Sequence, residues 1–306
     1  MMYRNDYFCG SFTQAAILNP TYPIYDPANA NGFFMPTGTG ASNPVEQMMQ
    51  KESYQDGNYF RGSVKATVNI KPVKGLRLSG FAAVEEGDTH NFWYNNVINT
   101  DLNGSGKAGR GSDFSFSKLF EATADYTRSL GMHNIAAVLG FSYQNFLYDG
   151  QSMENKGFPT DDAKYFQIGN GDASKEYLNA SSWRNSNTLA AVFGRVNYNY
   201  AEKYLVSASL RREGSSRFGA NNKWGLFPAV SLGWRITGED FMEDKTWVND
   251  LKLRAGFGVT GNNLGSDLKS VAMLSNGGTF WYNGQYVYTY GVSQNVNPDL
   301  RWEKKY

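Results

Sequence analysis

A strictly alternating run at residues 223–236 is the feature that most constrains the fold of this chain. In KWGLFPAVSLGWRI every even position is apolar or proline, whereas the odd positions are mostly small or charged. A period of two is that of a β-strand with one apolar and one largely polar face. Trp224 and Trp234 share the apolar face and are separated by roughly 33 Å along such a strand. A tilt of about 40° gives a height of about 25 Å, which matches the apolar band and aromatic girdles of an outer-membrane β-barrel. Soluble strands average only about 5–6 residues.

The same alternation recurs along the chain and predicts further strands in antiparallel pairs. The predicted pairs are 60–70 with 76–84, 116–126 with 135–143, 190–200 with 204–210, and 223–236 with 251–259. We therefore expect about eight strands, and a ninth that begins near Leu300. Tyr198, Tyr200 and Tyr204 gather at one predicted turn. With the two tryptophans they predict a lipid-facing aromatic girdle.

The predicted connections alternate in length. Those within hairpins are short, except for 237–249. Between hairpins, long structureless loops are expected at 87–115, 145–187 and 261–299, with a shorter one at 213–222. Soluble domains rarely contain several loops longer than about 15 residues, whereas outer-membrane barrels combine short periplasmic turns with long extracellular loops. A soluble β-sandwich or propeller would explain the alternation, but neither the strand length nor the loop asymmetry.

The other face of the predicted strands is polar and partly basic. Its residues are Arg195, Ser207, Ser209, Arg211, Ser231, Arg235, Lys252 and Arg254. If the apolar face meets lipid, these side chains line a polar interior. A solvated sheet face is the equal alternative.

Composition narrows the class of protein further. A net charge of +1 gives no sign of a nucleic-acid partner. No apolar run approaches the 18 or so residues of a membrane helix. Cys9 is the single cysteine, which excludes an internal disulfide. The first residues, MMYRNDYFCGSFTQ, lack the pattern of a secretory signal, and we therefore expect a truncated chain.

Several blocks of the sequence resemble a known family. They are NPTYPIYD at 19–26, YLVSASLRREGSSRFG at 204–219, NKWGLFPA at 222–229, LKLRA at 251–255, GVTGN at 258–262 and NPDLRWE at 297–303. In this order they resemble the SusC/RagA family of TonB-dependent outer-membrane transporters. The resemblance implies a barrel of about 22 strands with a plugged lumen. It also implies import of oligosaccharides (glycans) or peptides, energised by the TonB complex through an N-terminal plug, with a SusD-like surface lipoprotein as a lid.

Nothing in the chain resembles the plug, the TonB box or the strands that would close the barrel. We therefore expect an all-β internal segment of an antiparallel transmembrane β-barrel, embedded in outer-membrane lipid. Residues 1–57 are expected to be an irregular segment rich in proline and asparagine, and residues 58–306 the partial barrel. Two other functions remain open: a passive or structural barrel such as a porin or adhesin, and a soluble β-rich glycan-binding module.

Motifs for catalysis, cofactors or metals are weak. Residues 104–109 match G-x-G-x-x-G, but they lie in a predicted Gly/Ser-rich loop without the strand and helix of a dinucleotide site. Residues 101–112 resemble the start of a calcium loop, but the final glutamate is absent. His90 and His133 are the only histidines and cannot complete a zinc set. We therefore expect no catalytic residue, no metal and no cofactor.

Aromatic side chains in the predicted loops are the candidate binding residues. Trp93 and Tyr94 lie in one such loop, and Trp281 and Tyr282 lie in another. Exposed aromatic faces can stack on the apolar faces of sugars. The alternative is that these rings pack against neighbouring loops or the lid lipoprotein.

Overall fold

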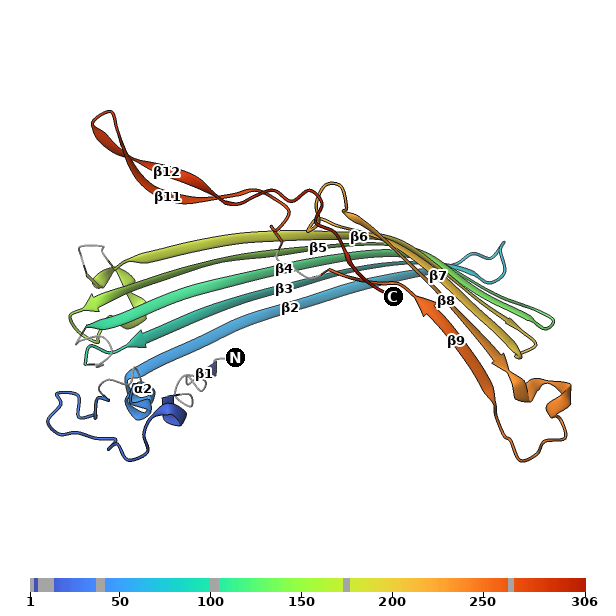
Figure 1. Ribbon diagram of the computed structural model, residues 1–306, viewed down its shortest axis with the longest axis horizontal. Helices are drawn as coiled ribbons and strands as arrows, with labels where there is room; N and C mark the ends of the chain where they lie inside the picture. Colours follow the sequence, from blue (N-terminus) through green and yellow to red (C-terminus); the bar gives the residue numbers. More distant parts are fainter. Residues whose placement is uncertain (1–2, 5–13, 37–41, 99–104, 173–176, 264–266) are drawn as a thin grey trace. The chain divides into compact units, whose positions relative to one another are not determined.

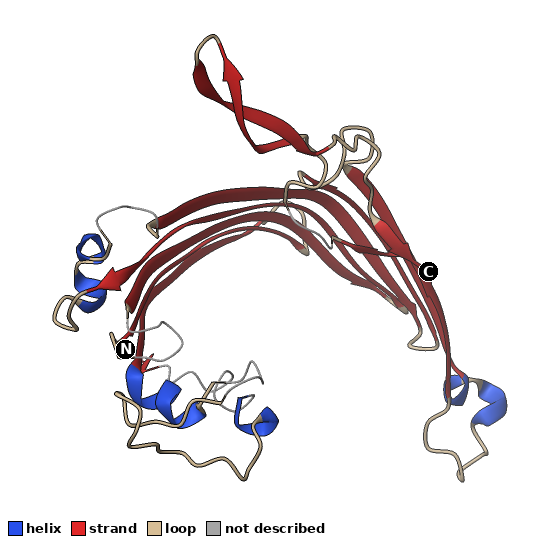
Figure 2. Cartoon of the chain, turned by 60° about the vertical axis from the view of Figure 1, so that its left-hand side comes forward, coloured by secondary structure: helices blue, strands red, loops and turns tan. Residues whose placement is uncertain are grey.

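The computed structural model describes residues 3–4, 14–36, 42–98, 105–172, 177–263 and 267–306. Figure 2 shows that most of these residues form strands. The chain divides into two compact units. The first is Met1–Phe60, Glu85–Phe116 and Tyr148–Arg184, and the second is Arg61–Val84, Ser117–Leu147 and Asn185–Tyr306. No helix in the described ranges is long and apolar enough to cross a membrane.

The strands are ordered in the main sheet as they occur in the chain (Figure 1). This nine-stranded sheet runs from β1 to β9. Its strands are β1 Tyr3–Arg4, β2 Lys51–Asn69, β3 Leu76–Asn95, β4 Gly106–Leu130, β5 His133–Phe158, β6 Asn179–Tyr200, β7 Tyr204–Ser215, β8 Trp224–Arg235 and β9 Lys252–Gly258. The predicted all-β class and antiparallel sheet are confirmed.

The remaining elements are small. β10 (Thr260–Asn262) pairs with β13 (Glu303–Lys305), and β11 (Met273–Tyr282) pairs with β12 (Gln285–Gln294). Helix α2 spans Pro44–Gln50 and begins at Asn43, whose side chain accepts hydrogen bonds from the backbone of Val45 and Glu46. Short 3-10 turns lie at Lys164–Phe166, Ile168–Asn170, Ile236–Gly238 and Asp240–Met242.

Strand register sorts the side chains of β6 to β9 into two faces. Antiparallel pairing places Val230 opposite Ala208 and Phe257. Along β7 the even residues from 204 to 212 are exposed, whereas the odd residues from 205 to 213 are partly covered. We call the first side the apolar face; it carries Tyr204, Val206, Ala208, Leu210, Leu226, Pro228, Val230, Leu232, Leu253 and Phe257. Large side chains on this face are exposed, as expected of a surface whose solvent is lipid.

The opposite, polar face carries all eight of the residues predicted for the interior. Register pairs Arg195 with Ser209, Ser207 with Ser231, and Arg235 with Lys252. Arg211 and Arg254 lie on the same face by register, opposite Phe193 and Gly233. The sequence pattern therefore separated the two faces correctly.

Five strands are longer than the alternation predicted. β2 to β6 contain 19, 20, 25, 26 and 22 residues. The expected loops at 87–115 and 145–187 are therefore wrong over most of their length, because β3, β4, β5 and β6 continue through them. Residues 149–156 read DGQSMENK. Such polar stretches give no hydrophobic period of two, although their backbones remain paired.

Other boundaries also differ from those predicted. β2 begins at Lys51, before the expected boundary at residue 58. β7 extends to Ser215, and the expected loop at 261–299 contains β10, β11 and β12. The expected final strand forms at Glu303–Lys305. Gly106 begins β4, so the predicted Gly/Ser-rich loop is a strand from there on; residues 101–104 and Cys9 lie outside the described ranges.

One tight turn has a residue requirement that the structure explains. Gly75 has a φ of 89°, and a Cβ atom there would lie 1.9 Å from the carbonyl oxygen of Thr127. Its own carbonyl accepts a hydrogen bond of 2.9 Å from the backbone N–H of Thr127. Only glycine allows this close approach of the β2–β3 turn to β4.

The two faces predict opposite effects for neighbouring substitutions. In the full-length protein, Val230→Arg is expected to destabilise folding in lipid by about 2–4 kcal/mol, because it places a charge on the lipid side near mid-depth. Ser231→Arg adds the same charge to the polar face and is expected to cost much less. Urea titration of both variants in lipid vesicles measures the difference. Equal costs would contradict the assignment of the faces.

Candidate functional site

Hairpin β11–β12 forms a separate two-stranded sheet that carries the densest group of aromatic side chains. Trp281 pairs with Tyr286, and Thr279 pairs with Tyr288. The rings of Trp281 and Tyr286 are 4.8 Å apart in an edge-to-face arrangement. Asn283 and Gly284 both have positive φ, as in the Asn-Gly turns of tight hairpins.

One face of this hairpin is a broad aromatic surface. Trp281 is 56% exposed, and Tyr286, Tyr288 and Tyr290 are 71–75% exposed. Phe280 and Val287 pair with each other on the opposite face. Residues 271–296 contain no charged side chain and are rich in Tyr, Gly, Ser and Asn. This composition is typical of binding loops that combine rigid aromatic contacts with adaptable hydrogen bonds. We call Trp281, Tyr286, Tyr288 and Tyr290 the aromatic face of the hairpin.

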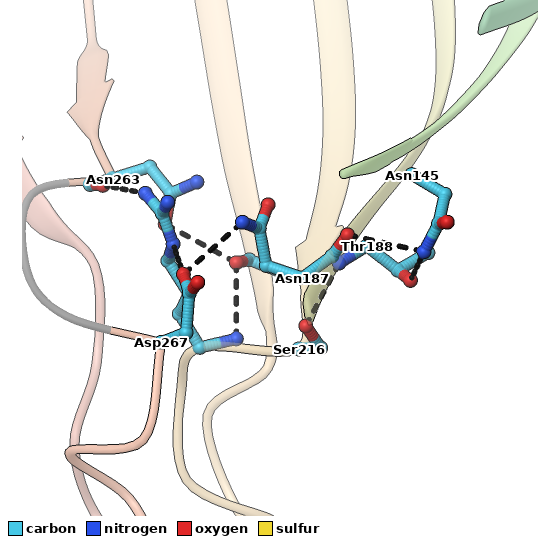
Figure 3. A network of polar contacts seen from close by, with 8 residues as sticks. Asn145, Asn187, Thr188, Ser216, Asn263 and Asp267 are labelled. Carbon is cyan, nitrogen blue, oxygen red and sulfur yellow. Dashed lines mark hydrogen bonds and ion pairs between the residues drawn. The ribbon is translucent and has the colours of Figure 1, made fainter. Parts of the chain in front are cut away.

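A polar network holds the chain that leads into the hairpin (Figure 3). Arg217 Nε lies 2.6 Å from Asp267 Oδ1, and the side chains are 26% and 9% exposed. Asn187 Nδ2 donates to the same carboxylate oxygen at 3.1 Å. Two donors from different parts of the chain thus converge on one nearly buried acceptor.

The network continues on both sides of this ion pair. Arg217 Nη1 donates to the carbonyl of Asn263 at 3.1 Å, and Ser215 Oγ donates to the Asn263 side chain at 3.1 Å. On the other side, Asn145 Nδ2 donates to the Asn187 carbonyl and to Thr188 Oγ1. Positions within β5 and β6 and the end of β7 are therefore linked to the segment that precedes the hairpin.

The base of the hairpin is fixed as well. Gln294 Nε2 donates to the carbonyls of Leu268 and Val271 at 2.6 and 2.8 Å. After the hairpin, the ring of Trp302 packs on Phe218 at 4.7 Å, and its Nε1 donates to the Lys223 carbonyl. The segments before and after the hairpin are thus both anchored near the β7–β8 connection.

Trp93 and Tyr94 have different surroundings from those predicted. Both lie in β3 rather than in a loop. A Cβ atom on Gly109 would lie 2.3 Å from the Trp93 ring, so the indole packs flat on β4. Tyr94 is 1% exposed, and its hydroxyl donates to Asp161 at 2.6 Å. Its burial leaves no ring face open to a ligand, because Tyr94 belongs to the core cluster of the first unit.

Trp281 and Tyr282, by contrast, are exposed, as a binding role requires. They belong to the second unit, whereas Trp93 and Tyr94 belong to the first. The sequence interpretation missed Arg217, Asp267 and the hairpin itself. The Asn283-Gly284 pair between aromatic runs was a usable hairpin signal. Nothing local in the sequence indicated that Arg217 and Asp267 meet.

Four of the five predicted girdle residues lie where β6, β7 and β8 meet the connections at one end of the sheet. Register places Tyr204 opposite both Tyr200 and Trp234 on the apolar face. Tyr198 bonds to the ring of His133 at 2.7 Å, and Trp234 Nε1 donates to Glu239 at 2.8 Å. The hydrogen bonds from Trp234 and then Tyr204 lower the pKa of Glu239 below its ordinary value. Trp224 lies at the other end of β8, and lipid contact by these five rings stays a prediction.

The described ranges contain no group of three or more His, Cys, Asp or Glu side chains that could hold a metal ion. The candidate site therefore consists of positioned aromatic and amide side chains. It can bind through stacking and hydrogen bonds.

Comparison with known proteins assigns the family. Residues 4–305 match the family described as TonB dependent receptor-like, beta-barrel. The chain belongs to this family. TonB-dependent receptors of this type are outer-membrane β-barrels of Gram-negative bacteria, so the predicted family and location are confirmed.

Individual relatives agree with this assignment. TonB-dependent receptor P39 of Formosa agariphila is 36% identical over 211 residues, which cover 68% of this chain and 19% of that protein. TonB-dependent receptor SusC of Bacteroides thetaiotaomicron is 28% identical over 313 residues, which cover 95% of this chain and 30% of that protein. The chain thus spans less than a third of the length of these TonB-dependent receptors.

Solved structures give the same fold. The RagAB peptide importer in its 'closed-closed' state is 25% identical with a TM-score of 0.80, covering 99% of this chain and 33% of that chain. The RagAB peptide transporter, at 24% identity and a TM-score of 0.77, covers 89% of this chain and 30% of that chain.

The polar network that holds the hairpin in this TonB-dependent receptor segment can be tested by removing Asp267, the acceptor that Arg217 and Asn187 share. Asp267→Ala leaves Arg217 and Asn187 without their shared partner and is expected to cost about 1–3 kcal/mol of local stability. Hydrogen exchange across residues 268–296 of the full-length protein should therefore become faster. Asp250→Ala is the matched control, because Asp250 pairs with Arg235 in an exposed position. Similar exchange in both variants would contradict a tethering role.

Proposed function

We propose that this chain is a barrel segment of a TonB-dependent importer of glycans or peptides, with residues 58–306 as the partial barrel preceded by the irregular segment 1–57. Its role is transport rather than catalysis. Membership of the TonB-dependent receptor family supports this proposal. The relatives named SusC and RagAB point to the same type of protein, and RagAB is itself described as a peptide importer.

We further propose that a SusD-like lipoprotein and the TonB complex are its partners. The likeness to SusC and RagAB supports the lipoprotein, and the family supports TonB dependence. Energy coupling would use parts of the protein beyond residues 1–306.

The observation that carries the proposed binding role is the aromatic face of hairpin β11–β12. Four exposed rings on one side of an uncharged hairpin suit a neutral polar ligand such as a glycan, or the backbone and side chains of a peptide. Trp281 keeps its proposed contact with substrate on this face, whereas Tyr282 pairs with Gln285 on the face of Phe280, so its proposed contact is a separate prediction. Trp93 is a weaker candidate because its ring already packs on Gly109.

Substitution on the two faces of the hairpin tests this role. In the full-length protein, Trp281→Ala combined with Tyr286→Ala should reduce uptake of the cognate glycan or peptide by about fivefold or more. This corresponds to about 1 kcal/mol of lost contact. Phe280→Ala, on the opposite face, is the matched control and should leave uptake near the wild-type rate. Outer-membrane abundance of each variant is measured in parallel.

A pull-down of the surface lipoprotein distinguishes the alternative. If the aromatic face packs against a lid, the double variant loses the lipoprotein while the isolated barrel keeps its ligand affinity. If uptake and pull-down are both unchanged, the aromatic face has neither role and the proposal fails.

A further inference from the structure

Arg212 is the one charged residue on the apolar face of β7 and β8, both of which are fully described. Its neighbours on this face are Leu210 along the strand, Val192 across to β6 and Leu226 across to β8. The alternation of exposure along β7 places Arg212 with the exposed, lipid-side residues. A charge on this side of a barrel is costly near mid-depth and tolerated only close to the interfaces.

The side chain is held at the boundary of the apolar band. Its guanidinium lies 5.2 Å from the ring centre of Trp224, a girdle residue. The indole lies flat on β7, because a Cβ atom at Gly214 would be 2.9 Å from it. Trp224 still has 53% of its surface exposed. Gly214 therefore lets the indole lie against β7, within cation–π distance of the guanidinium.

Polar groups begin just beyond this level. Past Gly214, the backbone N–H of Thr188 donates to Ser216 Oγ. From Tyr204 to Leu210, by contrast, the same face carries only aromatic and aliphatic side chains. Arg212 therefore sits where a membrane changes from acyl chains to headgroups.

Among the residues that the structure describes, Arg212 has no anionic partner, whereas its neighbour Arg211 has one. Arg211 Nε lies 2.7 Å from Glu213 on the polar face. Arg212 makes no hydrogen bond or ion pair within the described part of the chain, and its guanidinium makes a cation–π contact with the Trp224 ring. A guanidinium has five N–H donors in a planar fork that matches phosphate oxygens. All five are available at the membrane boundary.

We propose that Arg212 and Trp224 form a binding site for the phosphate of an anionic membrane lipid, in the leaflet on the side of hairpin β11–β12. The guanidinium binds the headgroup phosphate, the indole packs beside the glycerol or sugar region, and the acyl chains run along Leu210 and Leu226. The site rests on the outer-membrane location of the family and is independent of the imported substrate.

Other occupants fit less well. A carboxylate of a protein partner would have to enter from the lipid phase. Free phosphate would gain nothing from Trp224 or from the apolar surface beside it. A headgroup phosphate attached to acyl chains satisfies the cation and the apolar surface together.

The experiment compares two adjacent arginines on opposite faces. The full-length protein and its Arg212→Gln and Arg211→Gln variants are purified in detergent and titrated with phosphatidylglycerol by native mass spectrometry. A phosphate-free galactolipid is titrated in parallel. Arg212→Gln is expected to weaken phosphatidylglycerol binding about fivefold, in line with one basic group at a membrane surface. Arg211→Gln and the galactolipid titrations should show no change, and Arg212→Lys, which keeps the charge but loses the planar fork, should weaken binding less than Arg212→Gln does.

Several outcomes would overturn the proposal. Equal loss in both glutamine variants would mean that position on the lipid side does not matter. Unchanged phosphatidylglycerol binding by Arg212→Gln would mean that Arg212 does not contact the headgroup. Loss of galactolipid binding to the same extent would assign the effect to acyl-chain packing. Competition by millimolar inorganic phosphate as strong as that by the lipid would make this a free anion site. Unfolding temperatures of all variants in detergent establish that each comparison is between folded proteins.

Discussion

Pairing of the backbone is the constraint on which the rest of this structure depends. Hydrocarbon offers no partner for N–H and C=O groups, so a strand in a membrane must be paired along its full apolar length by neighbouring strands. Strands that follow one another in the chain satisfy this with short turns, and β1 to β9 are ordered in this way. The same ladder continues past the apolar band. β4 and β5 therefore stay long and regular even in the stretches where their side chains are polar.

A second feature of the sheet is that aromatic rings lie on glycines of the neighbouring strand. A Cβ atom at Gly109, Gly150 or Gly214 would clash with the rings of Trp93, Trp183 or Trp224, respectively. Each ring covers backbone that a glycine leaves bare, an arrangement known to stabilise strand pairs. The 33 glycines and many aromatic residues of the chain thus include matched pairs. An aromatic residue in such a pair is a packing group first, and the Trp93 ring packs on Gly109 in this way.

Hairpin β11–β12 shows the opposite use of aromatic residues. In the described ranges, its rings do not pack on glycines of the main sheet, and they remain exposed. The segments that flank the hairpin are fixed by partly buried polar contacts. A nearly buried ion pair stabilises weakly by itself, but it specifies geometry because its loss leaves a charge without a partner. Arg217 and Asp267 therefore act by fixing where the hairpin begins, and the aromatic face stays exposed at the surface. Arg212, five positions before Arg217 in the sequence, lies on the apolar face instead.

The sequence by itself determined the strand class, the two faces and the family, because all of these follow from a period of two and from local motifs. It also placed Trp281 among exposed aromatic residues correctly. Tertiary structure alone decided the true lengths of β3 to β6, since polar strands are paired by their neighbours without a hydrophobic pattern. It likewise decided the burial of Tyr94 by Phe158 and Asp161, and the meeting of Arg217 with Asp267. Those contacts join residues far apart in the chain, and no local pattern encodes such a distance.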